Sequence, residues 1–209
     1  MVTNYLPNNC TFFRLNRDIL SQCIPFNCGD KDLDDFFNND ADNFNRQLLG
    51  YSYCFRLNEN PSDIVCAFTV SNSSVDARHL PGSRKKKLVE FIPFEKRLKN
   101  YPAALIGRLG VNKNYSGKGI GAGLITYIKH LIVNPANPCA CRYLTVDAYN
   151  TPPTIHFYEA NGFQLLFSTE NQEREHIGLS VADELKTRIM FFDLIRLYGV
   201  SVPDHNLYQ

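Results

Sequence analysis

The order of apolar and polar positions along the chain predicts strands alternating with helices. Apolar residues at helical spacing predict a helix that begins after Asp30, one that continues past Phe44, and two more at 120–133 and 152–160. The last of these has Pro in its first turn and Gly162 just past its end. Short apolar runs predict strands at 11–15, 51–57, 64–70, 103–111, 143–148, 164–168 and 188–194. This alternation favours an α/β or α+β fold, a sheet with helices on its faces.

A single domain is expected to span residues 1–209. The chain has no internal repeat, low-complexity stretch or long linker, and its 44% hydrophobic and 21% charged residues are typical of a compact globular protein. The N-terminal residues are polar, and no apolar run approaches the roughly 18 residues of a membrane span. We therefore expect a soluble, cytoplasmic protein with no membrane partner.

The seven cysteines are scattered, most of them within apolar segments such as 53–55 and 65–67, which indicates reduced core thiols. Cys139 and Cys141 are separated by one residue, and no second Cys or His pair lies at zinc spacing. We therefore expect no metal site, and no catalytic thiol can be singled out.

With a net charge of +1, the chain lacks the overall basic excess of an obligate nucleic-acid binder. An anionic partner must therefore contact a local basic patch. Such a patch lies in a charged, partly helical insertion at about 84–99, which holds seven basic and two acidic residues. It can hold phosphates or be a solvated helix face. The candidate substrate-binding residues in it are Arg84, Lys85, Lys86 and Lys87. The early helices are acidic and could face a basic partner or water, through Asp30, Asp32, Asp34, Asp35, Asp40 and Asp42.

Glycines at alternate positions open the helix predicted at 120–133, in the run Gly117-Lys118-Gly119-Ile120-Gly121-Ala122-Gly123. Glycine there permits unusual backbone angles and lets helix N–H groups approach a large anion such as a pyrophosphate. The alternative is a flexible turn with close helix packing. A P-loop is excluded because Lys118 precedes Gly instead of Ser or Thr. A dinucleotide fingerprint fits formally, but five residues, 112–116, separate the glycines from the preceding strand.

A second motif follows the glycine series at the separation typical of one family. Asn150 stands at the exit of the strand predicted at 143–148, and after it comes Phe157-Tyr158-Glu159-Ala160-Asn161-Gly162-Phe163. With Leu109-Gly110-Val111 and the glycine series, these residues resemble the GNAT superfamily of acetyl-CoA-dependent N-acetyltransferases. Ser116 departs from the family's usual Gln or Arg.

The resemblance implies the GNAT fold, a mixed, mostly antiparallel central sheet that is splayed between its two middle strands and flanked by helices. It also implies acetyl-CoA as acyl donor. The cofactor-binding residues it implies are Leu109, Gly110, Val111, Ser116, Gly117, Lys118, Gly119, Ile120, Gly121, Ala122 and Asn150.

Three further segments resemble the GNAT-type toxins of bacterial toxin–antitoxin pairs, which acetylate aminoacyl-tRNA: 28–36, 101–111 and Leu144-x-Val146-Asp147-Ala148. That narrower resemblance implies aminoacyl-tRNA as acceptor and an antitoxin as partner, and a homodimer is among the expected assemblies. A small-molecule or protein N-acetyltransferase, and a non-catalytic CoA-binding module, remain the alternatives.

An acetyl transfer needs a proton donor for the leaving thiolate and an acceptor for the proton of the amine. Tyr158, a phenol with an ordinary pKa of about 10, is the predicted acid. The base is harder to find, because the strand at 103–111 carries no carboxylate. An α-amine, with a pKa of about 7.7–8.0, is already partly neutral, which favours such an acceptor with water taking the proton. His130 and His156 are alternative bases or plain packing residues.

Overall fold

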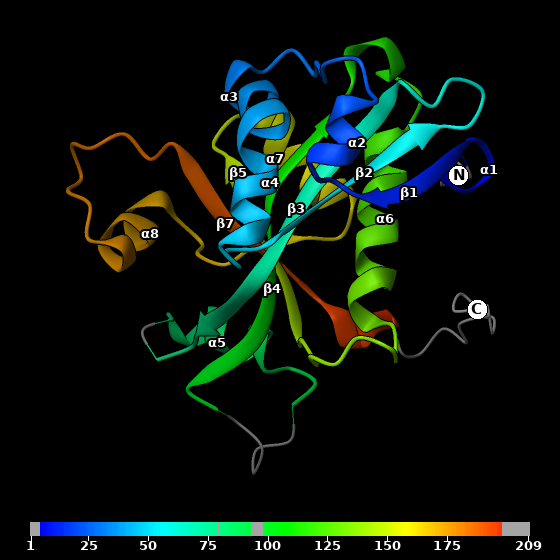
Figure 1. The fold of residues 1–209 in the computed structure, drawn as a ribbon. Helices are drawn as coiled ribbons and strands as arrows, with labels where there is room; N and C mark the ends of the chain where they lie inside the picture. The colour runs from blue at the N-terminus through cyan, green and yellow to red at the C-terminus, as the bar shows by residue number, and fades with distance from the viewer. Residues whose placement is uncertain (1–4, 79, 93–97, 198–209) are drawn as a thin grey trace.

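The computed structural model describes residues 5–78, 80–92 and 98–197 (Figure 1). Most of the predicted elements occur close to their predicted positions. In chain order the elements are α1 (Tyr5–Asn9), β1 (Cys10–Arg14), α2 (Arg17–Ser21), α3 (Lys31–Asp35), the π-helix η1 (Phe36–Asp40), α4 (Ala41–Arg46), β2 (Tyr51–Leu57), β3 (Ile64–Asp76), α5 (Gly82–Leu88), β4 (Asn100–Val111), the 3-10 helix η3 (Lys113–Tyr115), α6 (Ile120–Val133), β5 (Tyr143–Tyr149), α7 (Pro152–Ala160), β6 (Gln164–Leu165), α8 (Glu170–Ile177), β7 (Thr187–Asp193) and the 3-10 helix η4 (Leu194–Leu197).

The strands form one seven-stranded sheet in the order β1-β2-β3-β4-β5-β7-β6. Every pairing is antiparallel except that of β4 with β5, which is parallel and runs only from Ala103↔Tyr143 to Ile106↔Val146. Beyond Ile106, β4 continues to Val111 on the edge of β3 alone. The splayed, mostly antiparallel sheet predicted from the resemblance is therefore confirmed.

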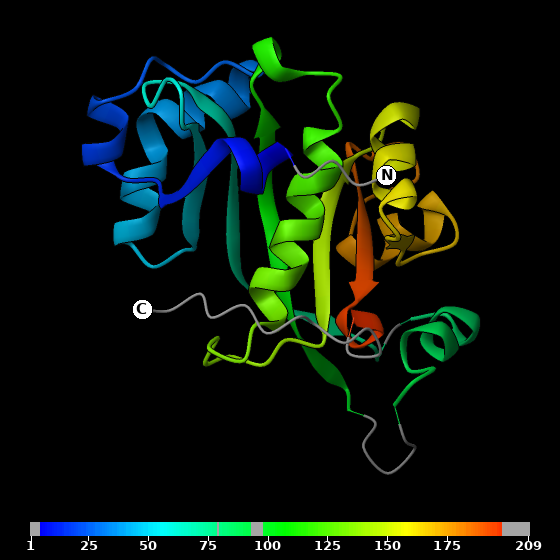
Figure 2. The ribbon, with the colours of Figure 1, turned by 90° about the vertical axis from the view of Figure 1, so that its right-hand side faces the viewer.

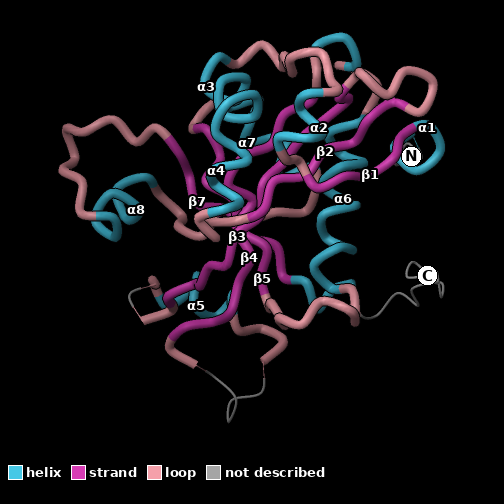
Figure 3. The backbone as a smooth tube through the Cα atoms, in the orientation of Figure 1, coloured by secondary structure: helices cyan, strands magenta, loops and turns pink. Residues whose placement is uncertain are grey.

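Helices cover both faces of this sheet (Figure 3). Helix α6 crosses one face (Figure 2), where its apolar stripe packs on Leu144, Val146 and Ala148 of β5. On the other face, α3, η1 and α4 bury Phe36 and Phe37 with Phe26. Helix α5 packs at the far end of the sheet, where Leu88 joins the cluster that contains Tyr101, Tyr143 and Phe191. Alternation along β5 places Tyr143 on the face opposite Leu144 and α6.

Several boundaries differ from the prediction. Strand β3 runs on to Asp76, because its polar residues 71–74 continue to pair with β4. The strand predicted at 164–168 is only β6, because Thr169 begins α8 by accepting a hydrogen bond from the backbone N–H of Gln172. The charged insertion forms α5 at its start. Residues 93–97, with Lys96 and Arg97, lie outside the described residues.

Candidate active site

A cavity of about 610 Å³ opens between β4 and β5 where their pairing ends. Its walls come from both faces of the sheet. Phe157 and Tyr158 of α7 lie on the side of α6, whereas Cys28 and Leu33 belong to the side of α3. Because the parallel register stops at Ile106, the cavity passes between the two strands. Two reactants can therefore meet within the sheet from opposite faces.

Leu109, Gly110 and Val111, three of the predicted cofactor contacts, line this cavity on β4. They pair with β3 on one side, which leaves the other edge of the strand facing the cavity. An extended arm with amide groups can pair with such an edge as an added strand does. A Cβ atom on Gly110 would lie 3.1 Å from the ring of Phe26, so glycine also permits the close packing of the 26–28 segment.

A bulge interrupts β4 at the mouth of the cavity. Thr69 pairs with Arg108 and Val70 with Ile106, so Gly107 is the extra residue. The hydroxyl of Thr69 is buried beneath Gly107 and has no hydrogen-bond partner among the described residues. A bulge re-aims backbone groups, and here it does so at a residue that lines the cavity.

The glycine series forms the turn before α6. Gly117 and Gly119 have φ values of 76° and 71°, in the left-handed region that favours glycine. Gly119 is the N-cap of the 14-residue helix and supplies no capping side chain, so the first N–H groups are open to a ligand. A Cβ atom on Gly117 would meet no atom within 4 Å. An uncapped N-terminus beside open space fits a pyrophosphate.

Other residues of the series serve packing. Ile120 is buried in the core, so only its backbone is available to a cofactor. A Cβ atom on Gly121 would lie 3.2 Å from the ring of Phe157, so this glycine brings α7 against α6. The Lys118 ammonium lies 5.5 Å from the centre of the Tyr115 ring. The contacts predicted for Ser116, Lys118 and Ala122 stay predictions.

Tyr158 is buried, with 7% of its surface exposed, and lines the cavity. Its ring packs edge to face on Phe157 and Phe163, at centroid distances of 5.1 and 5.4 Å. Burial raises the pKa of the phenol to about 12, because the phenolate would lose hydration. The hydroxyl therefore holds its proton at neutral pH, as a donor to a leaving thiolate requires.

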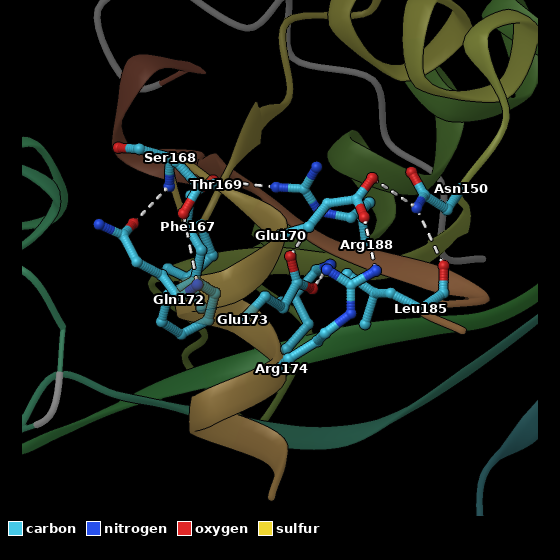
Figure 4. A network of polar contacts seen from close by, with 12 residues as sticks. Asn150, Phe167, Ser168, Thr169, Glu170, Gln172, Glu173, Arg174, Leu185 and Arg188 are labelled. Carbon is cyan, nitrogen blue, oxygen red and sulfur yellow. Dashed lines mark hydrogen bonds and ion pairs between the residues drawn. The ribbon is translucent and has the colours of Figure 1, made fainter. Parts of the chain in front are cut away.

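Asn150 belongs to a polar network that ties α8 to the β5–α7 loop (Figure 4). Its amide nitrogen donates to Glu170 Oε1 at 3.0 Å and to the carbonyl oxygen of Leu185 at 2.9 Å. Glu170 also pairs with Arg174 at 2.9 Å. Asn150 is not among the residues that line the cavity. The side chain thus fixes the loop, and its predicted contact with the cofactor stays a prediction.

The α3 side of the cavity is acidic. Asp30, Asp32 and Asp147 line it, with Arg108 as the basic residue and Tyr149 beside them. The Arg108 guanidinium lies 3.8 Å from the centre of the Phe36 ring. Burial, followed by the charges of Asp30 and Asp32, raises the pKa of Tyr149. Such a wall attracts a cationic amine.

Asp147 is the carboxylate that sequence reasoning missed as part of the site. It lies on β5, whereas a base was expected on the strand that corresponds to β4. One signal was available, since Asp147 is the charged residue of a mostly apolar strand.

The predicted basic residues lie away from this cavity, on α5. The Arg84 guanidinium donates to the carbonyl oxygen of Leu166 at 3.1 Å, so it anchors the helix. Lys85, Lys86 and Lys87 are exposed, and they form no ion pair with any described residue. From Tyr101, beside α5, to Leu109 in the cavity, β4 spans roughly 25 Å.

The remaining candidates contribute little to the cavity. His130 and His156 are exposed, and neither lines it. All seven cysteines are free thiols. Within 5–78, 80–92 and 98–197, no group of three or more His, Cys, Asp and Glu side chains is arranged to hold a metal ion. No helix in that part of the chain has the length and apolar character to span a membrane.

Comparison with known proteins agrees with this geometry. Residues 82–165 match the acetyltransferase (GNAT) domain family. A Tyr-to-Phe mutant of KacT aligns with a TM-score of 0.68 and 18% identity, over 91% of this chain and 98% of that one. AtaT complexed with acetyl-methionyl-tRNAfMet aligns with a TM-score of 0.67 and 21% identity, over 93% and 100% of the two chains.

A Tyr-to-Phe mutant of the toxin AtaT, bound to the C-terminus of the antitoxin AtaR and to acetyl-CoA, aligns with a TM-score of 0.62 and 20% identity, over 92% and 99% of the two chains. At these identities the likeness is one of fold. The matched domain, the splayed sheet and the open N-terminus of α6 agree on one enzyme family. Residues 82–165 thus match a GNAT acetyltransferase domain, and the protein is an acetyltransferase with acetyl-CoA as its acyl donor.

Proposed function

We propose that this acetyltransferase transfers the acetyl group to the α-amine of an aminoacyl-tRNA. The observation that carries the proposal is the lysine cluster, defined as Lys85, Lys86 and Lys87. These three ammonium groups are exposed and form no ion pair with any described residue. They lie on α5, which packs beside Tyr101, and from Tyr101 to Ile106, where the cavity lining on β4 begins, the strand spans roughly 17 Å. Only an extended anionic acceptor contacts both places at once.

The acceptor side of the cavity agrees with an α-amine. Its wall of Asp30, Asp32 and Asp147 attracts a cationic group and repels phosphates. An α-ammonium, with a pKa of about 7.7–8.0, is cationic enough to be attracted and loses its proton far more easily than a lysine side chain at about 10.4. The terminal amine of a charged tRNA fits this wall while its phosphates contact the lysine cluster.

The chain's own residues divide the work of the transfer. Acetyl-CoA, when bound, supplies the thioester. The first N–H groups of α6 hold its pyrophosphate, and the free edge of Leu109, Gly110 and Val111 orients its amide arm. The bulge at Gly107 aims backbone donors at the carbonyl oxygen that becomes negative as the amine attacks. Tyr158 gives its proton to the leaving sulfur.

A partner antitoxin completes the proposal. It draws support from the AtaT toxin structure with bound antitoxin and from the resemblance of segments 28–36 and 101–111. The acidic helices offer it less free charge than their composition suggests. Asp30 caps α3, Asp34 accepts the backbone N–H of Cys28 at 2.6 Å, and Asp42 pairs with Arg46 at 3.0 Å. A co-expressed antitoxin should suppress acetyl transfer by the purified complex.

The test is thiol release from acetyl-CoA with three acceptors: a mixture of charged tRNAs, the same tRNAs deacylated, and amino-acid amides. We expect charged tRNA to be used far better than the amides, and deacylated tRNA to be inert. Replacing the lysine cluster by Gln should weaken the use of charged tRNA. It should also reduce the slope of log affinity against log salt concentration by about 0.7–0.9 per lost phosphate contact.

Two controls separate recognition from folding. The Lys85→Arg, Lys86→Arg, Lys87→Arg variant keeps the charge and should keep activity on tRNA. Acetylation of amides should be the same in all three proteins, since the cluster lies far from the cavity. Equal losses on tRNA and amides, or amides used as well as charged tRNA, would favour a small cationic amine as acceptor, for which the acidic wall alone suffices.

A further inference from the structure

The orientation of Asp147 follows from the alternation of side chains along β5. Leu144, Val146 and Ala148 face the core beneath α6, together with Tyr158. Tyr143 belongs to the cluster on the opposite face. Asp147 has the same phase as Tyr143, so it faces away from α6, into the acceptor side of the cavity.

Strand β4 shows the same division of faces. Arg108 stacks on Phe36, and Gly110 packs against Phe26, so both residues face the α3 side. Tyr158 closes the cavity from the other side, on α7. Asp147 and Tyr158 therefore lie on opposite sides of the splay. A thioester held along β4 lies between a carboxylate and a phenol.

The Asp147 carboxylate is not engaged by any residue within 5–78, 80–92 and 98–197. It makes no hydrogen bond or ion pair with the residues that the structure describes. Its neighbour Asp30 differs, because Asp30 Oδ1 accepts the N–H groups of Asp32 and Leu33 at 3.0 and 3.2 Å. An unpaired carboxylate in a cavity wall is available to a ligand.

The groups around Asp147 come from four elements and one loop. The titratable or charged groups that line the cavity with it are Asp32 of α3, Arg108 of β4, Tyr149 of β5, Tyr158 of α7, and Cys28 and Asp30 of the segment before α3. The cross-strand neighbours on β7, Ile189 and Thr187, carry no charge. Asp147 reaches the solvent of the cavity, yet the protein around it displaces enough water to raise the pKa of its carboxyl. A carboxylate of raised pKa is a better proton acceptor than an ordinary one.

We propose that Asp147 binds the ammonium group of the acceptor and acts as the general base that accepts its proton during acetyl transfer. This inference rests on the proposed function in that it takes an amine as acceptor, but it does not depend on tRNA.

The proton and electron balance is complete. The bound ammonium first gives one proton to a carboxylate oxygen of Asp147, which leaves a neutral amine with a free electron pair. As this nitrogen forms its bond to the acetyl carbon, its second surplus proton passes to water. The C–S bond breaks with its electron pair on sulfur, and sulfur takes the proton of Tyr158. The products are the N-acetylated amine and CoA thiol. The Tyr158 phenolate then recovers a proton from solvent, and Asp147 releases its own.

The test compares the wild type with Asp147→Asn, which has nearly the same shape and no base. Both are assayed with the mixture of charged tRNAs and with alanine amide. We expect Asp147→Asn to lower kcat/KM by about 10²–10⁴-fold, with acetyl-CoA affinity within a few-fold. Asp147→Glu should recover part of the rate. Asp18 is an exposed acid on α2, so Asp18→Asn is the matched control and should have the wild-type kcat/KM.

The pH profile separates a base from a structural residue. The wild type can take up the ammonium form, so its kcat/KM should change little between pH 6.5 and the amine pKa of about 8. The variant needs an amine that is already neutral, so its kcat/KM should fall about tenfold per pH unit below that value. A native rate, or a loss that is equal at every pH, would overturn the role of Asp147.

Failure of the inference and failure of the proposed function give different results. A wild type that acetylates alanine amide but not charged tRNA refutes the tRNA proposal, while the amide data still decide on Asp147. If the wild type uses neither acceptor, calorimetry of alanine amide with the CoA-bound protein decides. We expect at least tenfold weaker binding by Asp147→Asn, and equal binding or none by either protein would overturn the inference.

Discussion

Gly121 of α6 lies against Phe157 of α7, so close that a Cβ atom on residue 121 would be 3.2 Å from ring carbon Cε2. Phe157 precedes Tyr158, and the two rings pack edge to face. The glycine therefore sets the distance between the helix whose N-terminus is the proposed pyrophosphate site and the helix that carries the predicted acid.

Gly121→Ala should impair catalysis more than stability. The added methyl group pushes on Phe157 and displaces Tyr158, and misplacement by up to about 1 Å costs up to about 10²-fold in kcat. The gain in helix propensity, about 1 kcal/mol, offsets much of the packing cost. Steady-state kinetics should therefore show a lower kcat, whereas thermal unfolding should show little change in stability. Gly82→Ala, where a Cβ atom meets no atom within 4 Å, is the control. An unchanged kcat in Gly121→Ala would show that α7 tolerates the shift.

Gly119→Asp should weaken acetyl-CoA binding by more than tenfold, since it brings a side chain and a negative charge to the N-terminus of α6. Gly119 has a φ of 71°, so part of any stability loss is backbone strain. Gly178→Asp places the same side chain at a φ of 76° at the end of α8 and should bind acetyl-CoA normally. Calorimetry on both variants decides, and equal affinities would remove the glycine turn from the cofactor site.

Tyr158→Phe should lower kcat by about 10²–10⁴-fold while acetyl-CoA affinity stays within a few-fold. In the wild type, the pKa of about 12 keeps the Tyr158 phenol protonated. Between pH 8 and 10.5, kcat should therefore show no decrease caused by ionisation of Tyr158. A fall in kcat centred near pH 10, with the fold intact by circular dichroism, would contradict the buried phenol.

The raised pKa of Tyr158 also makes the free energy of unfolding depend on pH. Burial raises the folded-state pKa of Tyr158 above the ordinary value of 10 in the unfolded chain, so its stabilising contribution is complete below pH 10 and is lost as pH rises towards 12. The unfolding free energy of Tyr158→Phe should therefore fall less steeply over that range than that of the wild type, as urea titrations at each pH can measure.

Glu173→Gln should cost about 3–5 kcal/mol of unfolding free energy, because it leaves the buried Arg188 guanidinium without its countercharge. Glu173 bonds Arg188 Nε and the backbone N–H of Ile189, at 2.6 and 2.5 Å, and so fastens α8 to β7 (Figure 4). Glu170→Gln, one turn away on the same helix and partly exposed, should lose much less. Urea unfolding of the pair tests this, and similar midpoints would contradict it.

The elements that sequence patterns predicted best are those with a clear apolar period. Helices α6 and α7 begin and end at the predicted residues because their apolar positions and glycine signals agree. Helix α8 was missed because Glu170–Ile177 is almost wholly polar, and its buried anchor is Glu173. A charged residue becomes a core residue only through a partner, Arg188, that local sequence does not identify.

The site was predicted in part for a similar reason. The glycine series and Tyr158 follow local motifs. Asp147 and Asn150 depend instead on where other segments lie. Asp147 enters the site because β4 and β5 separate after Val146, and the amide of Asn150 is held by Glu170, twenty residues further along the chain. Register and strand divergence are properties of pairing between distant segments, which a pattern within one segment does not encode.

The break in the sheet between β4 and β5 has a consequence for reaction order. In the proposed arrangement the donor approaches from the side of α6 and the amine from the side of α3, so neither would block the entrance of the other. Both must be present in one ternary complex, since the amine attacks the thioester directly. The kinetics should therefore be sequential without a compulsory first substrate, and the acetylated product can leave while CoA is still bound.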